Sequence, residues 1–138
     1  MAFIPINYED GQLIKLPMND GGSNADYTVG QALVISSGLY QTATAGQGTD
    51  VEAVCMEAGN ISTDGEELLC ISTRGVRFIA DTAADTAATQ VGTYVDLSSA
   101  TALDTTASDD DIFYLETIQY PLSGKQVRGW FQHGTVLA

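Results

Sequence analysis

The sequence contains very little positive charge. Of its 138 residues only five are lysine or arginine, whereas 18 are aspartate or glutamate, so the formal net charge is -13 at pH 7. Nucleic-acid binding needs a basic surface that neutralises phosphates, and binding to anionic membrane has the same requirement. We therefore expect neither nucleic acid nor membrane as a partner. The acidity indicates a well-solvated surface and, more specifically, would suit a basic partner surface.

Long apolar runs, targeting signals and cysteines are also scarce. No run of about 18 apolar residues occurs, so we expect no transmembrane helix. Residues 1–11 lack the basic start and apolar core of a secretory signal, which favours a cytosolic chain. Two cysteines are too few for a disulfide scaffold or a zinc site. If residues 52–58 and 67–72 form a hairpin, a symmetric register places Cys55 opposite Cys70, close enough for a disulfide. In the cytosol two buried thiols are the favoured interpretation.

Few side chains point to catalysis or to metal binding. His133 is the single histidine, and no surrounding motif pairs it with Cys55 or Cys70 as base and nucleophile. The acidic run at residues 109–111, with Asp104 nearby, lacks the pattern of an EF-hand calcium loop. A phosphate-binding glycine loop and a G-x-S-x-G motif are absent as well. We expect no enzyme, no metal and no cofactor.

What the sequence does contain is a series of short apolar stretches separated by turn residues. Several alternate between apolar and polar side chains, which is typical of β-strands with one buried face. Turn signals that recur every 8–15 residues predict an all-β domain, either a small β-barrel or a β-sandwich. Only residues 81–89 favour helix, and they are long enough for at most one short helical turn. The predicted strands are residues 31–35, 39–43, 51–58, 67–72, 76–80, 93–97, 102–104, 111–118, 126–132 and 135–137.

Residues 1–28 differ from the rest of the chain. Pro5 and Pro17 bias the residues before them toward extended conformations, and the polar run at 19–24 is typical of a loop. Two arrangements fit this pattern: an extended arm followed by a flexible loop, or the first two edge strands of the domain. We take the first as the predicted organisation, with an extended N-terminal arm and loop over residues 1–28 and a single β-domain over residues 29–138.

Trp130 and Phe131 are adjacent in a predicted strand, and adjacent strand residues face opposite sides. If Phe131 points inward with Val127, then Trp130 lies on the outward face with Arg128. An outward tryptophan beside an arginine is a plausible interface anchor. The alternative is a strand buried on both faces, with both rings inside. On the first interpretation Arg128 and Trp130 are interface candidates.

The order of these segments resembles a known family. A glycine-led strand pair, GQALVISSGLYQTA, is followed by a long strand, VEAVCMEAG. The stretch RGVRFIADTAADTAATQVGTYVDL then combines a strand ending in alanine, a loop of alanine and threonine, and a glycine-led strand, and KQVRGWF supplies a final strand. Over residues 29–134 the chain resembles the small β-domains of head decoration proteins of tailed bacteriophages, also called capsid cement or stabilisation proteins.

The resemblance implies a structural virion protein without a cofactor, made in the host cytoplasm and located on the capsid exterior. Its partner would be the major capsid protein of an assembled shell. Such proteins commonly sit as trimers at three-fold or quasi-three-fold positions, so we expect a homo-oligomer, with a trimer favoured over a monomer or dimer. Some members use an extended N-terminal arm that becomes ordered on the capsid. Here that role would fall to these capsid-contact candidates: Phe3, Ile4, Ile6, Tyr8, Leu13 and Leu16.

The chain departs from the compact members of that family in the length of its arm and in its acidity. The segment 81–91, with almost no large side chain and no positive charge, would pack closely at a symmetric contact or form a smooth outer surface. Two other functions also fit the sequence. One is another phage structural module, such as a head-fibre base, tail or adaptor component. The other is a carbohydrate-binding β-sandwich, with a platform drawn from Tyr8, Tyr40, Tyr94, Tyr114, Tyr120 and Trp130.

Overall fold

The structure is a computed structural model, and it describes residues 2–9, 12–118 and 125–134. These residues form thirteen β-strands and a 3-10 turn, η2 (Ala88–Gln90), so the predicted all-β fold is confirmed. The predicted strand at 135–137 lies outside the described residues. The strands are β1 (Ile4–Asn7), β2 (Leu13–Pro17), β3 (Ala25–Tyr27), β4 (Ala32–Ser36), β5 (Leu39–Thr42), β6 (Ala53–Cys55), β7 (Gly59–Ile61), β8 (Glu67–Ser72), β9 (Arg77–Thr82), β10 (Tyr94–Ser99), β11 (Ala102–Asp104), β12 (Phe113–Ile118) and β13 (Gln126–Phe131).

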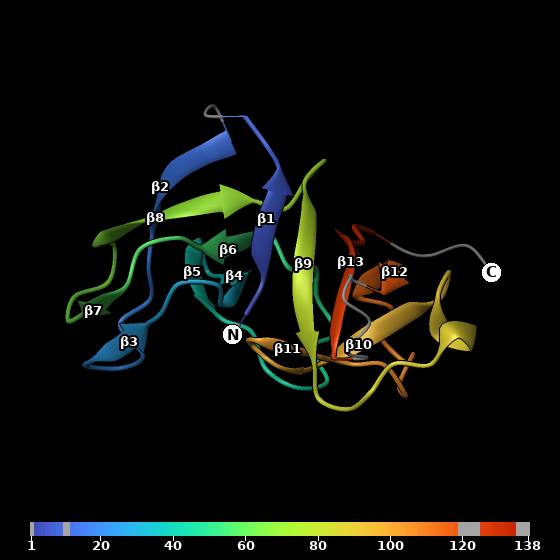
Figure 1. Cartoon of the computed structure of the whole chain (residues 1–138). Helices are drawn as coiled ribbons and strands as arrows, with labels where there is room; N and C mark the ends of the chain where they lie inside the picture. Colours follow the sequence, from blue (N-terminus) through green and yellow to red (C-terminus); the bar gives the residue numbers. More distant parts are fainter. Residues whose placement is uncertain (1, 10–11, 119–124, 135–138) are drawn as a thin grey trace.

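Five of the strands close into a small β-barrel, on the right of Figure 1. Around the barrel their order is β9, β11, β10, β12 and β13, and the pairing of β13 with β9 closes the ring. The pairs are antiparallel except that β11 runs parallel to β9. β1 pairs with residues 77–79 of β9, while β11 pairs with residues 81 and 82. β1 therefore extends the barrel wall and lies at a sheet edge.

A second sheet lies beside the barrel (Figure 1), in the order β2, β8, β6, β4, β5. This sheet curls, because Met18, just after its first strand, forms a parallel bridge to Tyr40 in its last strand. The two-stranded sheet of β3 and β7 packs on its outer face, where Tyr27 and Ile61 share a buried cluster with Leu33. The centre of the second sheet, at β6, is therefore covered on both faces.

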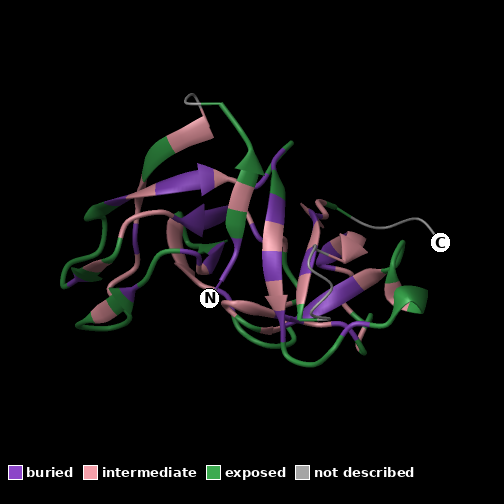
Figure 2. Cartoon of the chain, viewed as in Figure 1, coloured by how far each residue is buried: buried purple, intermediate pink, exposed green. Residues whose placement is uncertain are grey.

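The covering of both faces divides the buried side chains into two cores. Ala32 and Val34 of β4 point into a large core that they share with the barrel interior, and Leu33 between them points into a smaller core. Strand residues alternate between faces, so one strand supplies both cores. Figure 2 shows the purple, buried positions concentrated on the strands and the green, exposed ones mainly in the loops. This double burial explains the continuous apolar character of the stretch around β6.

The N-terminal segment takes the second of the two arrangements that its sequence allows. β1 pairs with β9, β2 pairs with β8 along five residues, and β3 pairs with β7. The backbone N–H of Phe3 also donates to the carbonyl of Gly30, 3.0 Å away. Residues 4–7 and 13–17 thus supply edge strands to the barrel sheet and to the second sheet.

Candidate functional site

The side chains of β13 alternate between the interior of the barrel and its outer surface. Val127 and Phe131 are buried at 0% and 2% exposure, whereas Arg128 and Trp130 are half-buried on the opposite side. Of the two interpretations of this strand, the one with Trp130 and Arg128 on a shared outward face is the observed one. Gly129 stands between them because a Cβ there would clash with the backbone carbonyl of Tyr114.

A row of aromatic rings crosses this outer face. Strand pairing places Tyr94 opposite Tyr114, and Tyr114 opposite Trp130. The Tyr94 and Tyr114 rings meet edge to face at 5.2 Å, and the Tyr114 and Trp130 rings stack at 4.5 Å between centroids. The row ends at Arg77, whose guanidinium carbon lies 5.7 Å from the Trp130 ring centroid. The indole is therefore held between a stacked ring and a cation.

Beside the aromatic row lies a small charged group. The Glu116 carboxylate forms ion pairs with Arg77 at 3.3 Å and with Arg128 at 3.5 Å. These two arginines are two of the five basic residues in the whole chain. Glu116 Oε1 and Arg128 Nε are buried, and neither makes a hydrogen bond within the described part of the protein. These are the two atoms of the 3.5 Å ion pair, so each faces an opposite charge without forming a hydrogen bond.

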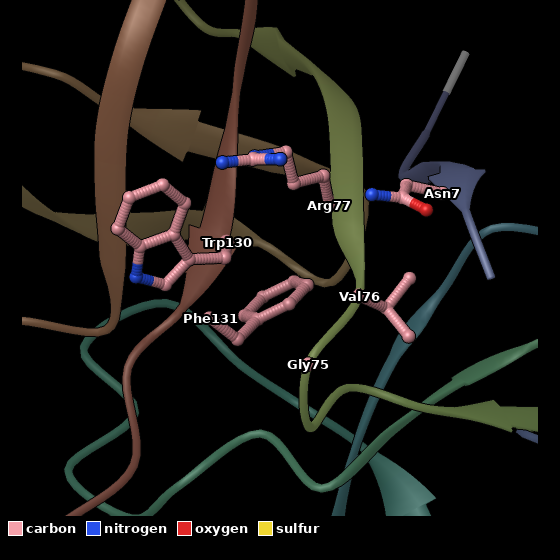
Figure 3. Close-up of a pocket in the computed structure, with 6 residues that line it drawn as sticks. All are labelled: Asn7, Gly75, Val76, Arg77, Trp130 and Phe131. Atoms are coloured by element: carbon pink, nitrogen blue, oxygen red, sulfur yellow. The ribbon is translucent and has the colours of Figure 1, made fainter.

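Two shallow hollows adjoin these residues. One, of about 360 Å³, is lined by residues that include Asn7, Arg77 and Trp130. The other, of about 340 Å³, is lined by residues that include Ile6 and Glu116. Figure 3 shows that the Arg77 side chain extends from β9 toward Trp130. Asn7 lies on the opposite side of β9 in this view. Both hollows are open, and they suit a contact surface better than an enclosed ligand site.

The six capsid-contact candidates of the N-terminal segment divide into two groups. Ile4, Ile6 and Tyr8 are exposed, at 36%, 38% and 41%. Leu13 and Leu16 are half-buried and pack against the large and the small core respectively.

Phe3, the sixth candidate, is buried in the large core. Its side chain is 1% exposed, and its ring lies 4.9 Å from that of Phe131 and 6.0 Å from that of Phe113. The assignment of Phe3 as a contact residue needs correction, because in this fold the ring reaches a partner only by leaving the core. The alternation along β1 turns Phe3 inward and leaves Ile4 and Ile6 outward.

The exposed part of β1 continues the aromatic row. Asn7 is the register partner of Arg77, and Ile4 is the register partner of Ile79. Ile6 lines the same hollow as Glu116 and Arg128. We call this continuous surface the outer face and define it by these residues: Ile4, Ile6, Asn7, Arg77, Tyr94, Tyr114, Glu116, Arg128 and Trp130. The sequence identified Trp130 and Arg128 as interface candidates and Tyr94 and Tyr114 only as candidates for a sugar platform. It did not indicate that Arg77 lies beside them.

The acidic run that sequence reasoning considered for calcium has a structural role. The Asp96 carboxylate is buried and accepts hydrogen bonds from the backbone N–H groups of Asp109, Asp110 and Asp111, at 2.9, 2.9 and 3.0 Å. Asp104 accepts hydrogen bonds from the amide and hydroxyl of Thr106. Across the described ranges, no group of three or more such side chains could hold a metal ion.

His133 contacts a threonine. Its Nε2 lies 2.8 Å from Thr73 Oγ1, and that hydroxyl donates its hydrogen to the carbonyl of Val51. The hydroxyl has no second hydrogen to give, so the ring nitrogen is the donor in this pair. The arrangement ties the end of β13 to the loop before β6.

Comparison with known protein families, with curated proteins and with solved structures finds no match to this chain. Among the described residues, no helix is long and apolar enough to cross a membrane. The outer face, with its exposed isoleucines, aromatic rings and arginines, is the candidate functional site of the described structure.

Proposed function

We propose that this protein binds the outer surface of an assembled icosahedral capsid and stabilises the shell, as a decoration or cement protein. The observation that carries the proposal is the outer face, in which exposed isoleucines of an edge strand adjoin a row of aromatic rings ending in arginine. Tryptophan, tyrosine and arginine are the residues that most often dominate the binding energy of protein interfaces. The resemblance of residues 29–134 to capsid decoration proteins supports the same conclusion.

The charge distribution favours the outer face over the rest of the surface as the docking region. Arg77 and Arg128 face one carboxylate there, Glu116, so these charged side chains sum to a small positive charge. The chain as a whole carries -13. An acidic shell surface would repel most of this acidic protein. It would repel the outer face less, because the charged side chains there sum to a positive value. A partner that presents basic residues at the rim would gain further attraction to the surrounding acidic surface.

Stabilisation of the shell follows from selective binding. A protein that binds assembled capsid and not free subunits shifts the equilibrium toward the assembled state by mass action. The partner is then the major capsid protein in its assembled form, and the protein acts at the virion exterior. We further propose a homo-oligomer on the shell, with a trimer favoured, because a three-fold site brings three copies together.

Co-sedimentation with capsids tests the proposal. Capsids of the virus that encodes the chain, assembled without it, are mixed with wild-type protein and with Ile6→Thr or Trp130→Ala. Ile35→Thr is the matched control, because Ile35 is also exposed, at 45% against 38% for Ile6, but lies on β4 in the second sheet. We expect wild type and control to pellet with shells, and each outer-face variant to bind more than tenfold more weakly. Circular dichroism melts verify that all variants fold.

The outcomes separate the alternatives. Failure of the wild-type protein to pellet overturns the capsid proposal and leaves a head-fibre, tail or adaptor component that forms rings or tubes. Pelleting with equal loss for Ile6→Thr and Ile35→Thr overturns the assignment of the outer face. Deleting residues 1–26 is a poor substitute, since it removes Phe3 and Met18 from the two cores.

Carbohydrate binding is a second candidate, favoured by one observation. The rings of Tyr94, Tyr114 and Trp130 form a continuous half-exposed row on the outer face. Trp130 is the only tryptophan, so its fluorescence reports on this platform alone. A saturable change on titration with a glycan, lost in Tyr114→Ala, supports this function. An unchanged signal across a glycan panel eliminates it.

A further inference from the structure

The two cysteines lie directly opposite each other in the second sheet. β6 and β8 pair antiparallel, and Cys55 is the register partner of Cys70. The register that the sequence predicts for this pair is therefore the observed one. Both side chains point to the same face of the sheet, into the small core, and both are fully buried as free thiols.

The position of the pair in the ladder brings the thiols close together. The N–H of Met56 donates to the carbonyl of Leu69 at 2.9 Å, so the hydrogen bonds flank Cys55 and Cys70 and do not join them. In such a non-hydrogen-bonded pair the Cα atoms approach to about 4.5 Å. Disulfides span Cα separations from about 4.4 Å upward. The separation typical of such a pair therefore lies within the range that a disulfide spans, near its lower end.

The chemistry of the pair indicates which of the two thiols reacts first. A hydrogen bond with the Cys70 thiol lowers the pKa of Cys55 to about 7, and the same interaction, with burial, raises the pKa of Cys70. Of the two thiols, Cys55 is therefore the one that loses its proton more readily. The thiolate is the species that attacks a disulfide.

We propose that Cys55 and Cys70 form a redox modification site, in which a small disulfide of the glutathione class converts the two thiols into a cross-strand disulfide. The Cys55 thiolate attacks one sulfur of the small disulfide, forms a mixed disulfide and releases one small thiol. The Cys70 thiol then attacks the Cys55 sulfur and forms the internal bond, and its proton leaves with the second small thiol. The two protein thiols lose two hydrogens in total, and the small disulfide is reduced to two thiols.

Burial determines when this reaction occurs. Both cysteines are 0% exposed, so a small disulfide reaches them only while the chain folds or when the sheet opens. The folded dithiol and the folded disulfide should each resist exchange. The bond would enclose the segment between β6 and β8, including β7, and would tie together two strands that lie between the two cores. Its stabilisation comes mainly from restricting the unfolded chain.

Refolding of the full chain under defined redox conditions tests the proposal. Denatured, reduced protein is refolded with a mixture of oxidised and reduced glutathione, or with excess reductant. We expect the oxidised product to be monomeric, to weigh two hydrogens less and to have no thiol that reacts after denaturation. Its Tm should exceed that of the reduced product by about 5–10 °C. The Cys55→Ala/Cys70→Ala variant should show no dependence of Tm on redox conditions.

Other outcomes overturn the proposal. Two reactive thiols after oxidative refolding would mean that the pair does not react. Two bound glutathiones, or a cross-linked dimer, would mean that the internal bond is strained. An internal disulfide that leaves Tm unchanged would remove its stabilising role. The mass and thiol measurements use wild-type protein alone, so the test does not depend on the folding of any variant.

Discussion

The barrel wall and the second sheet use β-strands in opposite ways. In β13 alternate residues face the core and the solvent, so Phe131 is buried while Trp130 lies outside. In β6 all three residues, Ala53, Val54 and Cys55, are fully buried, because both faces of the sheet are covered at this central strand. An open-faced strand can present a binding surface, whereas a strand covered on both faces can only stabilise the fold. The outer face and the thiol pair fall on opposite sides of this division.

The largest difference in stability should separate substitutions at two neighbouring residues, Phe3 just before β1 and Ile4 at its start. Phe3→Ala removes a ring that packs on Phe131 and Phe113 in the large core, and should lower the free energy of unfolding by about 3–5 kcal/mol. Ile4→Ala, the matched control, removes an exposed side chain and should cost less than about 1 kcal/mol. Urea unfolding followed by Trp130 fluorescence measures both. Equal, small effects would mean that the N-terminal segment is an undocked arm in solution.

Gly129→Ala should come next and tests how tightly β12 and β13 are packed. The added methyl would meet the Tyr114 carbonyl and the Phe113 ring inside the barrel wall, and overpacking against backbone costs about 3 kcal/mol. Gly48→Ala is the control, since its nearest contact would be an ordinary 3.7 Å to Asp110. Thermal melts should show a fall of about 10 °C for Gly129→Ala and little change for the control. A normal Tm for Gly129→Ala would refute the close approach of the two strands.

Asp96→Ala should cost somewhat less, about 2–3 kcal/mol, because three backbone N–H groups lose a charged acceptor. Asp104→Ala is the control: this half-buried carboxylate accepts hydrogen bonds only from Thr106, nearby in sequence, so the loss should stay below about 1 kcal/mol. Denaturant unfolding of both variants gives the difference. Similar costs at the two positions would show that the loop at 109–111 does not depend on Asp96.

Local pattern was enough to predict much of the fold. Alternation and turn residues predicted the all-β class and most strands, and they predicted the opposition of Cys55 and Cys70. Strand alternation also placed Trp130 beside Arg128. These features depend on residues close in sequence or on a symmetric hairpin register, which local rules describe well.

The rest depends on pairings between distant segments. Arg77 reaches Trp130 only because β9 pairs with β13, some fifty residues away, and closes the barrel. The sequence does not distinguish Phe3 from the exposed isoleucines that follow it. The pairing of β1 with β9 decides which side of this segment is buried. The short strand β7 was missed since its partner β3 lies far away in the sequence. The alternation of apolar and polar residues within one segment does not indicate which distant strand that segment pairs with.

The smallest effect concerns the edge of the second sheet, where β2 meets β8. Glu57 accepts a hydrogen bond from the Leu69 N–H at 2.8 Å and forms an ion pair with Lys15 at 3.3 Å. The amide first and the lysine second lower the pKa of Glu57 below its ordinary value of 4.5. A carboxyl with a lowered folded-state pKa contributes stability that is present above 4.5 and lost as pH falls through the folded pKa. Glu57→Gln should therefore lower Tm slightly near neutral pH and leave it unchanged at about pH 3.

Glu67→Gln, at an exposed glutamate at the start of β8, is the matched control variant. Melts at a series of pH values, with the variant curves subtracted from wild type, provide the measurement. A pH-independent difference for Glu57→Gln would mean that the amide carbonyl of glutamine replaces the carboxylate fully. The edge of the sheet would then depend on the hydrogen bond to Leu69 and not on charge, in contrast to the outer face, where Glu116 joins two arginines.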